Sequence, residues 1–190
     1  MSQETCYSEK YSEGRKNINR IKEISYITIF TSLALGFGFL LSYIPNLELT
    51  TSTVFLSGVL FGPKVGILVG SLTFLIFGLL NPLGLSPIPL LLSQIVGGIL
   101  IGFVGGFCNE KGWNKSYIFG LLGFILTILY DLLTTFGGAI LFFPKKKTLS
   151  AYLLAGLPFN LWHIFTQVFI YGVILSQIAK KIKRKEALCC

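Results

Sequence analysis

Long apolar stretches recur along this chain of 190 residues, from Tyr26 almost to its end. Several approach the roughly 20 apolar residues that a helix needs to cross the hydrocarbon layer of a bilayer. Only 13% of the residues are charged, against 53% hydrophobic, and nearly all the charge lies in short segments between the apolar runs. Because lipid cannot satisfy open backbone groups, the runs are expected to be helices. The sequence therefore predicts an all-α integral membrane protein.

Six apolar runs predict a compact bundle of six transmembrane helices, at residues 26–44, 49–61, 65–80, 88–107, 116–143 and 152–179. The second and third runs are short for a full crossing and are divided by Gly62, Pro63 and Lys64. They are therefore either two thin helices or one long interrupted helix.

The basic residues favour six spans over five. With six spans and a cytoplasmic N-terminus, every Lys and Arg lies inside except Lys145, Lys146 and Lys147. Five spans would place the basic C-terminal cluster outside, which the positive-inside rule disfavours. We therefore predict two cytoplasmic termini, a polar N-terminal segment at 1–25, a membrane domain at 26–179 and a basic tail at 180–190. Residues 1–25 show no pattern of a cleavable signal peptide.

Several kinds of chemistry have no support in the sequence. The net charge of +8 comes from basic residues beside hydrophobic segments, so no nucleic-acid partner is predicted. The four cysteines have neither C-x-x-C spacing nor nearby histidines, so no metal site is predicted. A P-loop for ATP and the common hydrolase and protease motifs are absent, which predicts a non-catalytic chain without a cofactor.

Small residues predict close helix packing. Glycines repeat every four residues in the second and third runs and again in the fourth, at Gly58, Gly62, Gly66 and Gly70, and at Gly98, Gly102 and Gly106. The first run carries Ala34 and Gly38, with Ser32 and Gly36 interleaved. That surface either packs inside the bundle or receives a helix of another protein.

Polar side chains inside a membrane are costly, so each one is a candidate for function. In the last run they form one stripe at helical spacing, made of Asn160, His163, Gln167 and Tyr171. The fifth run has a matching stripe that contains Asp131, and residue rise places Asp131 and His163 at a similar depth. The two residues either join the helices as a structural pair or belong to a ligand site.

Further polar groups fall in the half of the bundle that is predicted to face outward. Glu48 lies between the first two runs, Asn81 ends the third, and Gln94 lies about two turns into the fourth. With the aromatic rings of Tyr130 and Trp162 they predict an outward-facing cavity that binds a small solute. Since no Lys or Arg lies within any run, a neutral or cationic, ring-containing solute is favoured over a carboxylate.

These features resemble the substrate-binding S components of energy-coupling factor (ECF) vitamin transporters. The resemblance rests on four stretches: LSYIPNLELTTSTVFLSGVLFGPKVGILVGSLTFLIFGLLNPLG at 41–84, PLLLSQIVGGILIGFVGG at 89–106, LYDLL at 129–133 and LPFNLWHIFTQ at 157–167. It covers most of residues 26–179, and its motifs are loose patterns rather than catalytic signatures.

The resemblance implies a membrane subunit that captures a vitamin or precursor outside a prokaryotic cell and docks on a transmembrane coupling protein driven by two ATPases. It implies docking through an A-x-x-x-A pattern on the first helix, at Ala34 and Gly38, where glycine is a departure. It also implies a ligand under the loop that contains Glu48. On this basis Gly38→Leu is expected to abolish docking while solute binding survives.

Two other classes of protein fit the sequence. A membrane scaffold would bind no small molecule, and a proton-coupled secondary transporter would work without an ATPase and use His163 beside Asp131 as a proton relay.

Overall fold

The computed structural model describes residues 3–42, 48–82, 84–113, 115–142 and 146–188, which form helices and short connections without a strand. Within these ranges, side chains are placed for residues 18–42, 48–82, 84–113, 115–139 and 156–182. Lys145 and the side chains of Lys146 and Lys147 lie outside them, as do Cys189 and Cys190.

Five described helices are long and apolar enough to cross a membrane. They are α1 (Gln3–Leu41), α3 (Pro63–Leu80), α4 (Ile88–Glu110), α5 (Ser116–Phe142), and a last span in which α6 (Lys146–Phe169), the π-helical turn η1 (Ile170–Leu175) and α7 (Ser176–Leu188) follow one another. The sixth predicted span is α2 (Thr50–Phe61), which has only 12 residues. The prediction of six transmembrane helices is thus confirmed in part: five are long enough to span a membrane, and the second is a shorter apolar helix.

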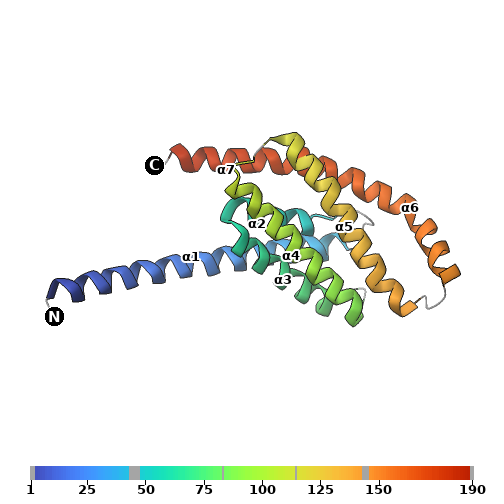
Figure 1. Cartoon of the computed structure of the whole chain (residues 1–190), viewed down its shortest axis with the longest axis horizontal. Helices are drawn as coiled ribbons and strands as arrows, with labels where there is room; N and C mark the ends of the chain where they lie inside the picture. Colours follow the sequence, from blue (N-terminus) through green and yellow to red (C-terminus); the bar gives the residue numbers. More distant parts are fainter. Residues whose placement is uncertain (1–2, 43–47, 83, 114, 143–145, 189–190) are drawn as a thin grey trace.

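The two ends of the chain leave the bundle on the same side. Figure 1 shows α1 projecting far from the other helices toward its start, and α7 ending on that same side. The polar segment predicted at 1–25 continues into the first span as one helix, since α1 has 39 residues. Its first turns are rich in Glu, Lys and Arg, which are good helix formers.

The short helix α2 lies at the centre of the bundle. Every residue from Thr50 to Val59 is buried, and α2 packs against α1, α3 and α4. At its C-terminal end, the Phe61 ring stacks on Tyr26 of α1, with ring centroids 4.1 Å apart. Twelve residues of helix span about 18 Å, well short of the roughly 30 Å of hydrocarbon. Its protein neighbours, rather than lipid, therefore surround α2.

Gly62 and Pro63 divide α2 from α3, so the two predicted thin helices form rather than one interrupted helix. Gly62 has φ +91°, a left-handed conformation that only glycine adopts easily, and Pro63 begins α3. After this turn α3 packs against α2, and a Cβ at Gly66 would lie 2.9 Å from the Cα of Gly58. Gly62 therefore makes the turn and does not belong to the packing ridge predicted for it.

The remaining glycines bring backbones into direct contact, as predicted. Gly66 and Gly102 face each other, Gly70 faces Gly98, and Gly58 lies against the backbone of α4 between Gly102 and Gly106. A side chain at any of these positions would overlap a backbone atom of the neighbouring helix. Close approach of this kind raises the van der Waals contact between helices that are surrounded by lipid. The three helices α2, α3 and α4 form a tightly packed unit around these contacts.

The last span is interrupted twice. Pro158 lies inside α6, where it removes a backbone hydrogen bond, and η1 widens the helix between Ile170 and Leu175. The residues between these two interruptions include His163 and Gln167, both of them buried. The polar stripe of the last span therefore lies on a helical segment with an irregularity at either end.

We predict that Gly102→Ala destabilises the protein, because the new Cβ would overlap the Gly66 carbonyl. Overpacking of this kind costs about 1–3 kcal/mol. The expected result is a fall of several degrees in the melting temperature of the detergent-solubilised protein. Gly36→Ala is the matched control, since no atom lies within 4 Å of a Cβ at Gly36. Equal melting temperatures for the two variants would contradict the packing described above.

Candidate functional site

His163 on α6 lies between two carboxylates. Its Nδ1 is 3.0 Å from Oδ1 of Asp131 on α5 and 3.2 Å from Oδ2 of the same carboxylate. Its Nε2 is 3.5 Å from Oε2 of Glu48, which precedes α2. The depth argument from residue rise therefore placed Asp131 and His163 correctly. One imidazole joins three segments of the chain that are distant in sequence.

Gln167, one turn beyond His163, fastens the same segments together. Its Nε2 donates to the backbone carbonyl of Glu48 at 2.6 Å, and its Oε1 accepts from Oγ of Ser52 on α2 at 3.0 Å. The Gln167 side chain is fully buried, so both of its polar ends need these partners. These bonds hold the start of α2 against the last span.

His163 has two ways to complete its hydrogen bonding. In both, Nδ1–H donates to Asp131. In the neutral ring, the Nε2 lone pair accepts from Nε2 of Gln167, 3.4 Å away. In the protonated ring, Nε2–H donates to the Glu48 carboxylate. The ring can therefore exchange one partner for another without moving Asp131.

The cluster is shielded unevenly from its surroundings. The side chains of His163 and Asp131 are 9% and 14% exposed, whereas that of Glu48 is 27% exposed. Glu48 is therefore the member most accessible to a solute. Below the cluster, a narrow void between α2, α4, α5 and the last span has no volume open to a water molecule; it is lined by Thr51, Ile101, Leu126, Thr127, Tyr130, His163 and Tyr171.

Aromatic rings form the floor of this region. Tyr130 is buried against Phe74 of α3, with centroids 5.3 Å apart, and its ring lies over Gly97 of α4. Tyr171 is buried against Phe55 of α2 at 4.8 Å. The glycine at 97 lets the Tyr130 ring approach the α4 backbone closely.

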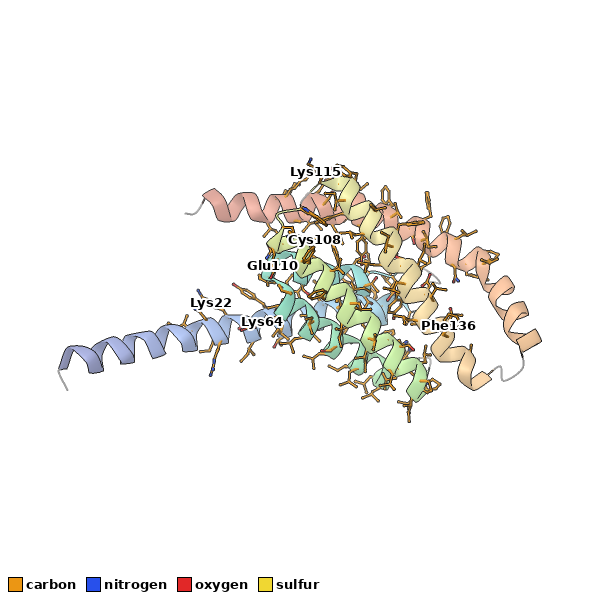
Figure 2. The ribbon with its side chains drawn as sticks, viewed as in Figure 1. Lys22, Lys64, Cys108, Glu110, Lys115 and Phe136 are labelled. Carbon is orange, nitrogen blue, oxygen red and sulfur yellow. The ribbon has the colours of Figure 1, made fainter. Side chains whose placement is uncertain are left out.

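The described basic side chains belong to the opposite end of the molecule. Figure 2 shows Lys64, Glu110 and Lys115 toward the end from which α1 and α7 project, with Phe136 at the other end. Among residues with placed side chains, none of the Lys or Arg groups contacts Glu48, Asp131 or His163. In that same part of the chain, no group of three or more His, Cys, Asp and Glu side chains is arranged to hold a metal ion.

The structure gathers five of the predicted site residues and leaves four apart. Glu48, Tyr130, Asp131, His163 and Gln167 surround one region. Asn160 is half-buried one turn before His163 on the same helix. Asn81 ends α3, and Gln94 lies beside Gly78 between α3 and α4, with its Oε1 buried and without a partner among the described residues. Trp162 is 57% exposed and stacks on Phe165, on the outward face of α6.

The residues predicted for partner docking are also buried. Ala34 is fully buried, and a side chain at Gly38 would meet Thr50 and the Phe77 ring at 2.9 Å. Of the two possibilities left open for this surface, the structure thus gives internal packing. The interleaved Ser32 and Gly36 lie on the exposed face of α1 instead.

Sequence reasoning missed the hydroxyl groups at the start of α2. Thr50, Thr51, Ser52 and Thr53 are all buried, and Ser52 bonds directly to Gln167. The available signal was a run of four hydroxyl residues in an apolar segment that is too short to cross a bilayer. Such a run indicates contact with protein rather than with lipid.

Comparison with known proteins gives one family. The family described as "ECF transporter, substrate-specific component" matches residues 25–175. No significant match to a curated protein or to a solved structure was found. The matched range runs from within the first span, through the His163 cluster, to the end of η1. With its membrane-length helices, this chain belongs to the substrate-specific components of ECF transporters.

Proposed function

We propose that this protein is the capture subunit of an ECF-type importer in a prokaryotic cell membrane, with both termini in the cytoplasm. It binds a vitamin or related micronutrient from outside, and a transmembrane coupling protein with two ATPases moves that solute into the cell. Family membership supports the class of function. The solute chemistry and the binding residues are inferred from the cluster around His163.

The observation that carries the proposal is a pair of carboxylates on one imidazole, with no described basic side chain beside them. With both carboxylates ionised, the cluster keeps a net negative charge whether His163 is neutral or protonated. A carboxylate ligand would meet repulsion there, and its own charge would lack a partner. A cationic solute, or a neutral ring rich in N–H groups, fits the cluster instead.

Glu48 is the group that such a solute would contact first. Its contact with His163 is the longest in the cluster, at 3.5 Å, and its side chain is the most exposed. A ligand N–H that replaces His163 as its partner leaves His163 free to accept from Gln167, 3.4 Å away. The site thus gains a charge-assisted hydrogen bond without leaving the imidazole unpaired.

Two further groups suit the same solute. The ring of Tyr130 borders the void next to His163 and offers an aromatic surface to a cationic ring. Gln94 lies apart from the cluster, between α3 and α4, but its buried Oε1 has no described partner and would accept an N–H from a solute long enough to reach it. Small-molecule sites usually enclose about 300–1,000 Å³. The void beside His163 has no volume open even to a water molecule. Solute binding must therefore separate Glu48 from His163 and widen this void.

For the coupling protein, we propose the exposed face of α1. This face carries the small pair Ser32 and Gly36 one turn apart, bordered by Ile29, Leu33 and Leu40, which are 60%, 44% and 73% exposed. Small residues four apart give a flat surface on which another membrane helix can lie closely. The pair Ala34 and Gly38 is buried against the chain's own helices, which favours the exposed pair over it.

The first experiment is native mass spectrometry of the purified protein, to detect a small molecule that has travelled with it. We expect a cationic or N–H-rich ring compound, released when the protein unfolds. If the protein is empty, it is screened by melting temperature against vitamins of both charge types. A stabilising carboxylate vitamin with no response to any cation would overturn the proposed solute chemistry, and no response to any compound would favour the scaffold.

We predict that Glu48→Gln weakens binding of the identified solute about tenfold or more, because hydrogen bonds to charged groups contribute roughly 1.5–3 kcal/mol. The backbone carbonyl of Glu48 still accepts from Gln167, so the fold should survive. Titration calorimetry measures the change. Glu110→Gln, which makes the same substitution at the exposed inner end, is the control. Equal affinities in both variants would remove Glu48 from the site.

We predict that Gly36→Leu abolishes co-purification with the coupling protein while the melting temperature stays near that of the wild type. No atom lies within 4 Å of a Cβ at Gly36, so the added side chain points away from the bundle. Gly38→Leu should instead lower the melting temperature, since its Cβ would press on Phe77 and Thr50. Retained co-purification in Gly36→Leu would mean that docking uses another face.

A further inference from the structure

A second feature is an apolar groove between α5 and the last span, which runs from Ser116 to Phe165, two residues from His163. It encloses about 660 Å³, within the range of roughly 300–1,000 Å³ usual for small-molecule sites. Its walls are Ser116, Tyr117, Gly120, Leu121 and Phe124 on one side, and Phe165, Val168, Phe169, Gly172 and Val173 on the other.

The groove exists because two glycines meet at its floor. A Cβ at Gly120 would lie 3.7 Å from the Cα of Gly172, at ordinary van der Waals distance, so the two helices approach each other closely there with no side chain between them. The large side chains on either side stand well exposed, with Tyr117 at 68%, Leu121 at 58% and Phe169 at 55%. The missing side chains leave a channel along the crossing, with apolar rims on both sides.

One end of the groove is basic. Nζ of Lys180 lies 3.5 Å from Oγ of Ser116, and Nζ of Lys115 lies 5.8 Å from the centre of the Tyr117 ring. Oγ of Ser116 is in turn 3.0 Å from Oγ of Ser176. Figure 2 shows Lys115 at the start of α5, where α5 lies against α7. Two exposed ammonium groups and a hydroxyl thus converge on the mouth of an otherwise apolar channel.

We propose that this groove binds one anionic phospholipid, with an acyl chain between Leu121 and Phe169 and the phosphate at Lys115, Lys180 and Ser116. The groove matches both parts of an anionic phospholipid. Its apolar channel, which opens toward lipid, suits the acyl chain, and its positive charge lies at the level of the headgroups. The positive-inside rule places this end in the cytoplasmic leaflet, where anionic lipids supply a negative surface. This lipid site is separate from the proposed solute site. A bound lipid would contact both helices where α5 crosses the last span.

The test uses the full-length protein, stripped of lipid in detergent and titrated with phosphatidylglycerol or with phosphatidylcholine. Native mass spectrometry counts bound lipid, and melting temperature reports stabilisation. We expect phosphatidylglycerol to bind and stabilise more strongly. Lys115→Ala with Lys180→Ala should weaken its binding by about thirtyfold, since a lysine near an anionic surface contributes roughly fivefold. Lys111→Ala is the control, because Lys111 lies at the same end over Phe107 of α4.

A second pair of variants tests the acyl chain. Leu121→Trp should block the groove and reduce lipid retention, whereas Leu129→Trp, on the same helix but outside the groove, should not; both positions are exposed, so both variants should fold. Equal binding of the two lipids, or unchanged binding in the double lysine variant, would overturn the proposal. So would stabilisation by inorganic phosphate alone. Loss of the coupling protein from Leu121→Trp with lipid retention unchanged would assign the groove to a partner helix instead.

Discussion

The length of α2 is the constraint on which the rest of this structure depends. Twelve residues of helix cannot cross a bilayer, so α2 is stable there only if protein encloses it. The glycine contacts of α3 and α4 provide that enclosure by bringing backbones within touching distance of one another. The C-terminal end of α2 is held by the Phe61 stack on Tyr26. Glu48, Asp131, His163 and Gln167 meet at its opposite, N-terminal end.

The polar cluster is therefore also part of how the bundle closes. Gln167 holds the segment before α2 by its backbone and holds α2 itself through Ser52, while His163 joins the same segment to α5. A structural role and a ligand role are compatible here because they use different atoms. The backbone of Glu48 is fixed, and its carboxylate has the longest contact and the greatest exposure in the cluster. The site combines a firmly held frame with one side chain that can change partners.

Much of this arrangement was predictable from local patterns in the sequence. Helical spacing put Asp131 and His163 at one depth, and the four-residue glycine repeats identified the contacts of α3 with α4. The local patterns did not predict which face of α1 is buried or which side of α6 carries Trp162. Ala34 and Ser32 are two residues apart on one helix, and only the packing of α1 against α2 and α3 decides that Ala34 is buried while Ser32 is exposed. The same holds for Trp162, which is adjacent to His163 in sequence and points outward.

The two interruptions of the last span affect how its parts are oriented. A helix with an unbroken hydrogen-bond ladder follows one smooth axis, so the direction of one end fixes the direction of the other. Here Pro158 and η1 break the ladder on either side of the segment that carries His163 and Gln167. The direction of that short segment is therefore set by its own bonds to Glu48, Ser52 and Asp131 rather than by the line of α7. The second bend lies at η1, where Gly172 of the last span approaches Gly120 of α5, so this crossing sets the course of α7 away from the cluster.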